Sequence, residues 1–430
     1  MTDEPSQPER WRAWTWVPSL YFAQGLPYEV VMSVSVALYT NLKIPNEQTA
    51  FATSLLYLPW VIKPFWSPLI EVVGTARRWI VTMQLACALA MGGVAFALTQ
   101  SWFLVASFVC LWVLAFASAT HDIAADGFYM SGMPPKDQAW FVGIRSTFYR
   151  MAKLAGAGLL LIIAGRLSER MSVPTAWAWT FSAAMGVFVA LALYHQFALP
   201  RPPAPPRDEN ASLTFAMAET VRTFFAKPNI GWAILFMLLY RFPESQLVKL
   251  AQPFLLDDRA NGGLGLVTEQ VGWLHGVLGV TMLTIGGILG GIVGSKYGLR
   301  KCLMPMAVVM HLPNLAYVAL AFMQPETLPP IGAAIAVEQF GYGFGFAAYL
   351  MYLLELSRGP YQTAHYALCT GFMALGMMLP GLVCGYIQKY LGYDWFFVWV
   401  MLAAIPSLLA TWWAPLNQEE EMGNAADFPK

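Results

Sequence analysis

The sequence has few charged residues. Asp, Glu, Lys and Arg make up 12% of its 430 residues, whereas soluble domains carry about 25%. Hydrophobic residues reach 57%, which excludes an ordinary soluble domain and predicts a chain that crosses a bilayer many times. The 25 basic and 25 acidic side chains cancel, so we expect no nucleic-acid partner.

Cysteines and catalytic motifs are also scarce. The five cysteines are scattered through apolar stretches and show no metal-ligand or redox spacing. The chain contains no glycine-rich phosphate loop and no His-Glu-x-x-His motif. We therefore expect no metal, no cofactor and no enzymatic activity. The alternative is an intramembrane enzyme that uses His121 and Asp122 as an acid and base.

Apolar runs long enough to span a bilayer dominate the chain, since a spanning helix needs about 20 residues. The twelve candidates cover residues 14–40, 48–71, 79–99, 102–130, 139–165, 173–198, 230–256, 269–295, 303–323, 329–356, 363–388 and 394–414. We therefore predict an all-α polytopic membrane protein with 12 transmembrane helices. The lysines and arginines of the loops favour the side of the N-terminus, which predicts that both termini are cytoplasmic.

The segment between the sixth and seventh runs differs from the rest. It is first proline-rich and polar and then amphipathic, which is typical of a linker. We expect a cytoplasmic tail at residues 1–13 and a six-helix bundle at 14–198. A cytoplasmic linker at 199–228 then leads to a second six-helix bundle at 229–415 and a second cytoplasmic tail at 416–430.

Two loops repeat each other across the two halves. SPLIEVVGTARR follows the second run and GIVGSKYGLRK follows the eighth, and the two stretches align in constant register, with Gly74 opposite Gly298. A loop with a glycine at the bend, an acid at the helix end and bases beyond it could hold neighbouring helix ends together in one state and let them separate when the halves move. We therefore expect a gating role for Glu71, Gly74, Arg77, Gly298 and Arg300, although Arg77 could serve only to fix the topology.

Two parallel six-helix repeats with this loop pattern resemble the major facilitator superfamily. KPFWSPLIE at 63–71, HDIAADGFYM at 121–130 and FVGIRSTFYRMAKLAG at 141–156 are similar to the branch that holds the AmpG muropeptide permeases and the acetyl-CoA transporters. The resemblance implies a secondary transporter of the bacterial cytoplasmic (inner) membrane. It also implies import of sugar-peptide cell-wall fragments driven by protons, and we expect a monomer.

The same resemblance points to particular charged residues. Asp122 and Asp126 match an Asp-Ile-x-x-Asp pattern of the fourth helix, and Arg145 matches a Gly-x-Arg setting of the fifth. Two positions depart from the branch: His121 replaces a neutral polar residue, and Arg241-Phe242-Pro243-Glu244 is not part of its pattern.

Helical depth sorts the charges within the runs into two layers, because each helical residue rises by about 1.5 Å. Transporter sites lie near the bilayer midplane, so we expect the deeper layer, about 18–24 Å from the cytoplasmic side, to bind the solute. This layer contains Glu29, Arg150, Lys153, Arg241 and Glu244, with Glu338 close to it. Its mixed charge suits an anionic or zwitterionic solute such as an amino-sugar peptide, with a siderophore-like or CoA-linked anion as the alternative.

The second layer lies nearer the cytoplasm and carries the expected proton coupling. Asp122 and Asp126 are four residues apart on one helix face, and two neighbouring carboxylates in a low dielectric resist ionising together. The full set is His121, Asp122, Asp126, Arg145 and Lys63. Permanent structural ion pairs are the alternative interpretation for these groups. Lys249 is expected to be an anchor that reaches toward the membrane surface.

Overall fold

The computed structural model describes residues 12–67, 70, 74–133, 135–201, 213–359 and 361–416, and these residues form helices joined by short turns. The N-terminal half contains six crossings, which we call spans 1 to 6. Their helices are α2 (Val17–Glu29), η1 (Val30–Val34) and α3 (Ser35–Asn41); α4 (Asn46–Leu55), α5 (Leu58–Ile62) and η2 (Lys63–Phe65); α7 (Ala76–Ala97); α8 (Phe103–Ser131); α9 (Pro135–Lys153), η3 (Leu154–Leu160) and α10 (Leu161–Ser168); and α11 (Val173–Ala198).

The C-terminal half repeats this arrangement after α12 (Leu213–Phe225). Spans 7 to 10 are α13 (Ile230–Leu239) and α14 (Phe242–Leu256); α15 (Thr268–Val271), η5 (Gly272–Gly279) and α16 (Val280–Tyr297); α17 (Leu299–His311), η6 (Leu312–Asn314) and α18 (Leu315–Met323); and α19 (Leu328–Ser357). The short η4 (Arg259–Asn261) lies in the loop after span 7. Spans 11 and 12 form α20 (Gln362–Trp412), which reverses at Gly392, where φ is 72°.

Seven described helices are individually long and apolar enough to span a membrane, and a bent pair, Ala218–Phe225 with Ile230–Leu256, adds an eighth candidate. The number is below twelve partly because α20 makes two crossings and because spans 1 and 2 are divided into shorter helices. The predicted all-α polytopic fold of two six-helix bundles is confirmed.

Among the described residues, three crossings contain π-helical segments, η1, η3 and η5, a form that is frequent at functional sites. Glu29 is the last residue before η1 and Lys153 the last before η3. Gly25-Leu26-Pro27 could interrupt the first span, but α2 continues through Pro27 to Glu29. Span 7 does break, between α13 and α14, with Pro243 at the start of α14, where proline's missing N–H costs nothing.

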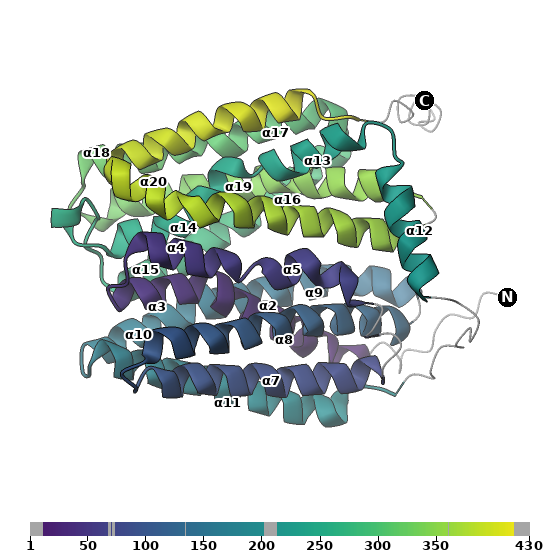
Figure 1. Cartoon of the computed structure of the whole chain (residues 1–430), viewed down its shortest axis with the longest axis horizontal. Helices are drawn as coiled ribbons and strands as arrows, with labels where there is room; N and C mark the ends of the chain where they lie inside the picture. Colours follow the sequence, from purple (N-terminus) through teal and green to yellow (C-terminus); the bar gives the residue numbers. More distant parts are fainter. Residues whose placement is uncertain are drawn as a thin grey trace.

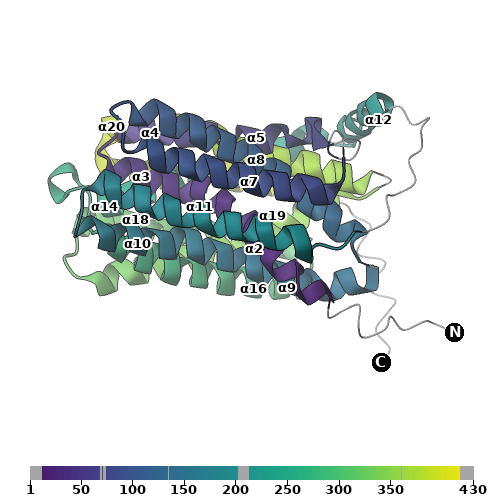
Figure 2. The ribbon, with the colours of Figure 1, turned by 90° about the horizontal axis from the view of Figure 1, so that it is seen from below.

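The two halves lie side by side, and the helices of both run along the long axis of the molecule (Figure 1). Spans 2 and 11 pack against each other, as do spans 5 and 8. The described chain begins and ends at one end of the bundle, near α12 (Figures 1 and 2). We call this the termini end and the opposite one the far end. The line along which the halves meet is called the seam.

Polar contacts close the seam at the far end. Asn46 donates to the Tyr393 hydroxyl at 2.7 Å, and Lys389 Nζ lies 2.6 Å from Glu47 Oε1. Further contacts between the halves join Thr268 to Asn41, Arg166 to Glu269, Lys43 to Asp258, Asn46 to Asp257 and Gln388, and Gln252 to Ser33.

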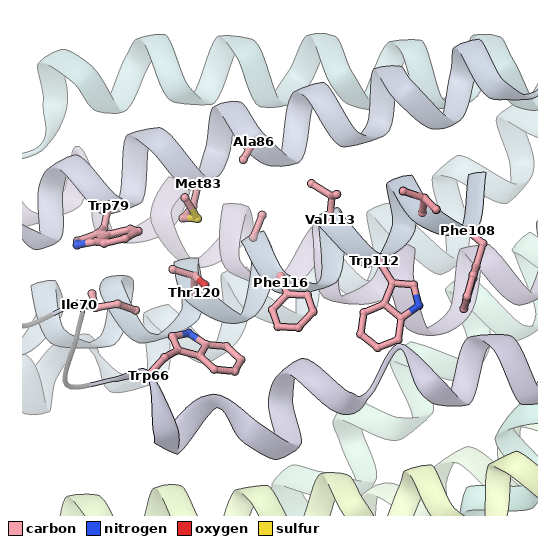
Figure 3. A pocket seen from close by; sticks show the side chains of 12 residues that line it. Trp66, Ile70, Trp79, Met83, Ala86, Phe108, Trp112, Val113, Phe116 and Thr120 are labelled. Atoms are coloured by element: carbon pink, nitrogen blue, oxygen red, sulfur yellow. The ribbon is translucent and has the colours of Figure 1, made fainter. Parts of the chain in front are cut away.

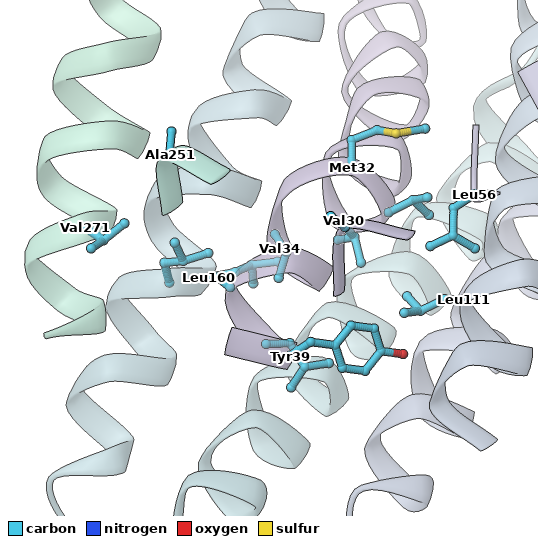
Figure 4. Packing of buried hydrophobic residues seen from close by; sticks show 14 of the residues in the cluster. Val30, Met32, Val34, Tyr39, Leu56, Leu111, Leu160, Ala251 and Val271 are labelled. Carbon is cyan, nitrogen blue, oxygen red and sulfur yellow. The ribbon is translucent and has the colours of Figure 1, made fainter. Parts of the chain in front are cut away.

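The apolar core is also continuous across the seam. Val30, Val34 and Leu160 of the N-terminal half belong to one buried cluster with Ala251 and Val271 of the C-terminal half (Figure 4). The two halves are therefore joined along the seam by an apolar core and, at the far end, by polar contacts. The structure describes a state that is closed at the far end.

Candidate functional site

Asp122 lies at the junction of spans 1, 2 and 4. Its Oδ2 is 2.7 Å from Lys63 Nζ, and its Oδ1 accepts a hydrogen bond from the Gln24 amide. Lys63 is the first residue of the short η2 turn of span 2. The side chains of Lys63 and Asp122 are 19% and 18% exposed, so two partly buried opposite charges pair here, which offsets the cost of their partial desolvation.

Asp126 lies one turn further along α8 with partners of its own. Its Oδ1 is 3.2 Å from Arg145 NH2 and accepts a hydrogen bond from the Tyr21 hydroxyl at 3.1 Å. The Arg145 guanidinium also covers the rings of Tyr21 and Tyr129, at 4.5 and 4.9 Å. The Asp126 side chain is 41% exposed, so it reaches solvent more readily than Asp122.

The structure thus brings four of the five predicted coupling residues, Lys63, Asp122, Asp126 and Arg145, into one cluster. Tyr366 of span 11 lies close enough to Lys63, Asp126 and Arg145 to interact with them electrostatically. The cluster therefore faces the seam.

His121, the fifth predicted coupling residue, points elsewhere. It is buried, and its Nε2 lies 3.0 Å from the Gln84 amide nitrogen. Gln84 Oε1 lies 3.0 Å from His195 Nδ1, and His195 Nε2 is 2.9 Å from the Ser19 hydroxyl. His121 thus belongs to a buried chain that joins spans 1, 3, 4 and 6 inside the N-terminal bundle.

In the deeper layer, Glu29 and Lys153 of the N-terminal half face Arg241 of the C-terminal half. Lys153 Nζ is 3.9 Å from Glu29 Oε2. Arg241 donates to the Tyr342 hydroxyl and lies 4.7 Å from the Phe346 ring centre. Arg241 and Tyr342 lie close enough to Lys153 to influence its charge, so these groups approach one another across the seam.

Arg150 differs from the other bases of this layer. It is half-buried on α9 and makes no hydrogen bond or ion pair among the described residues. Its NH2 lies 3.7 Å from the position that a Cβ would take on Gly287 of α16. Within the described part of the chain, Arg150 therefore approaches the seam as a cation without a partner acid.

Glu244 and Glu338 lie inside the C-terminal bundle. Glu244 Oε1 is 2.8 Å from His311 Nδ1, and His311 Nε2 is 2.7 Å from the Ser407 hydroxyl. Glu338 accepts a hydrogen bond from the Gln339 amide at 2.9 Å. The deeper layer predicted from the sequence contains three acids and three bases. Among the described residues, Glu29 is the only one of these acids that pairs with one of these bases.

The aligned glycines of the two repeated loops have the same φ. Gly74 and Gly298 both have φ of 77°, a conformation that L side chains rarely adopt. Each glycine stands just before a helix, α7 or α17, and Arg77 in the first of these donates to the carbonyl of Gln196 at the end of span 6. Arg300 is exposed in the first turn of α17. Glu71 lies outside the described residues.

An apolar groove of about 800 Å³ lies on the flank of spans 2, 3 and 4 (Figure 3). It is lined by aromatic and aliphatic side chains that include Trp66, Trp79, Trp112 and Phe116, with Thr120 as a polar contributor. None of the described residues that line this groove is charged, so it does not suit a polar solute.

Sequence reasoning missed several partners of the charged groups. The missed hydrogen-bond partners are Gln24 for Asp122, Tyr21 for Asp126 and Tyr342 for Arg241. Gln24 was detectable as a polar residue in an apolar run next to Gly25-Leu26-Pro27. The tyrosines were not, because their side chains suit lipid, core and site equally well.

Two six-helix bundles with charged residues between them define a secondary transporter. The family model described as Major Facilitator Superfamily matches residues 19–248, and the chain belongs to that superfamily. It is a membrane-embedded transporter of a small solute and not an enzyme.

Known proteins of similar sequence include a permease and a putative transporter. The anhydromuropeptide permease of Escherichia coli K12 is 25% identical over 397 residues, covering 91% of this chain and 77% of its own. Putative transporter AmpG 4 of Rickettsia conorii is 23% identical, covering 90% and 93%. An uncharacterized protein of Haemophilus influenzae is 26% identical, covering 93% of each chain. The predicted resemblance to the AmpG branch is thereby confirmed.

Solved structures share the fold at low sequence identity. A D-xylose-proton symporter has a TM-score of 0.72 at 12% identity, covering 95% of this chain and 98% of its own. A bacterial homolog of the human lysosomal transporter Spinster has a TM-score of 0.68 at 16% identity, covering 95% and 98%.

Proposed function

We propose that this protein imports a muropeptide or amino-sugar-like compound together with protons across the bacterial cytoplasmic (inner) membrane. The termini end then faces the cytoplasm and the far end faces outward. The similarity to an anhydromuropeptide permease over 91% of the chain supports the solute class.

Proton coupling rests on one observation, the pairing of Asp122 and Asp126 with different cations at the seam. Lys63 holds the less exposed carboxylate at 2.7 Å, and Arg145 holds the more exposed one at 3.2 Å. The bases come from spans 2 and 5, which also contact the C-terminal half. Movement of the halves would alter these pairs, and an acid that loses its cation in a low dielectric binds a proton more readily.

In the proposed cycle, Asp126 binds a proton when Arg145 moves away and releases it when the pair re-forms. Solute binding would use Glu29, Lys153, Arg150 and Arg241, whose mixed charge fits a zwitterionic amino-sugar peptide. The aromatic rings of Tyr342 and Phe346 lie beneath the Arg241 guanidinium and would hold this cation in place for the solute.

The test compares Asp122→Asn and Asp126→Asn in proteoliposomes loaded and assayed with anhydromuropeptide. Coupling predicts that at least one variant loses uptake driven by a proton gradient and keeps solute exchange at equal pH. Glu169→Gln, an exposed acid at the far end of span 5, is the matched control and keeps both activities. If both variants lose the two activities in parallel, or lose neither, these aspartates do not carry the proton.

A further inference from the structure

Lys249 of α14 is a buried lysine at the seam, not the surface anchor that its position in the sequence suggests. It is 1% exposed, and its Nζ donates to the Thr53 hydroxyl of span 2 at 3.0 Å. The same Nζ lies 5.0 Å from the ring centre of Tyr57, also in span 2. Lys249 therefore joins the two halves directly.

The described surroundings of Lys249 contain no counter-ion. Among the described residues no carboxylate lies within ion-pair distance of its Nζ, and the titratable groups that face it are Tyr57 of span 2 and Cys384 of span 11. By contrast, Lys63 and Lys153 each pair with an acid. A charged ammonium that is fully buried without a counter-ion is strongly destabilising.

The position of Lys249 ties its burial to the conformation of the carrier. Spans 2, 7 and 11 enclose it: Thr53 and Tyr57 come from span 2, and a Cβ on Gly381 of span 11 would lie 3.6 Å from Lys249 Cγ and 2.3 Å from the Ser54 hydroxyl. This packing exists only while the halves meet at the far end. Separation of the halves there would expose Lys249 to water.

We propose that Lys249 is a coupling residue of the far-end gate: its ammonium gives its proton to water as the far end closes and takes one back as the far end opens. The neutral amine can still donate a hydrogen bond to Thr53 in the closed state. Acid pH then favours the open far end, and alkaline pH favours the closed one. The proposal requires alternating access, which the family has, but not a particular solute or the role proposed for the aspartates.

The experiment measures the distance between spin labels on the two halves. Ser101 and Thr327 are exposed in far-end loops of the N- and C-terminal halves, and both are changed to cysteine in a chain whose five native cysteines are replaced by alanine. Distances are recorded in nanodiscs between pH 6 and pH 9. The ratio of closed to open molecules should rise with pH by up to about tenfold per unit, the limit for one proton.

The variants Lys249→Met and Lys249→Gln should remain closed over the whole pH range. Two neutral replacements are used because one of them could fail to fold. Lys296→Met removes an exposed lysine at the termini end and should keep the wild-type profile. The proposal is overturned if either neutral variant that folds keeps the wild-type pH dependence, or if the wild type shows none. A dependence that disappears in Asp126→Asn but persists in Lys249→Met would also overturn it, and would assign the pH response to the aspartates.

Discussion

Gly276 of η5 lies where the backbones of the two halves pack closely together, and it offers a sharp test of far-end closure. A Cβ at this position would lie 2.1 Å from the carbonyl oxygen of Ala157 and 2.4 Å from Gly158 Cα, both in η3 of the other half. These contacts are with backbone atoms, so rotation of a side chain cannot relieve them. Gly276→Ala should therefore force spans 5 and 8 apart by roughly 1 Å or more if contacts are to reach about 3.4 Å.

The free-energy cost of this overpacking is about 1–3 kcal/mol. Because the two bundles can separate, the cost should appear mainly as a shift toward the state open at the far end. That energy corresponds to a change of about 5–150-fold in the ratio of closed to open molecules. Each bundle should keep its stability, since the clash lies between the bundles and not within one.

The assay uses the Ser101 and Thr327 spin-label pair, and thermal unfolding serves as the check on folding. Gly291→Ala of the same span is the matched control, because its added methyl group meets no atom within 4 Å. A closed population in Gly276→Ala equal to that of the wild type and of Gly291→Ala would refute the proposed closure through η3 and η5.

Two further predictions concern the candidate site and the repeated loop. Arg150→Ala should raise the half-saturation concentration for an anionic solute by about tenfold or more, because it removes a cation that no described acid neutralises; unchanged uptake kinetics would remove Arg150 from the site. Gly74→Leu should reduce turnover while solute binding stays close to that of the wild type, because φ of 77° is strained for leucine. Loss of binding with normal turnover per bound carrier would show that the loop does not gate.

The sequence by itself determined the class of protein and much of its plan. Long apolar runs must cross the membrane as helices, because a backbone in lipid has no water to satisfy its polar groups. The loop pattern that recurs in constant register identified the two halves, and the equal φ of Gly74 and Gly298 shows why glycine recurs in that loop. Charged residues in apolar runs are costly unless they are paired or hydrated, so the depths of Asp122, Asp126, Lys63 and Arg145 along their helices made pairing among them an expectation that the structure then shows.

Only the tertiary structure decided which charges face each other and which face the interior of a bundle. Depth along a helix is readable from sequence at about 1.5 Å per residue, but the direction of a side chain around the helix depends on how neighbouring helices pack. Glu244 has the depth of a solute ligand and yet pairs with His311 inside the C-terminal bundle. Lys249 has the sequence position of a surface anchor and yet lies at the seam, bound to Thr53 of the other half. Both outcomes depend on contacts between helices far apart in the chain, which local sequence does not encode.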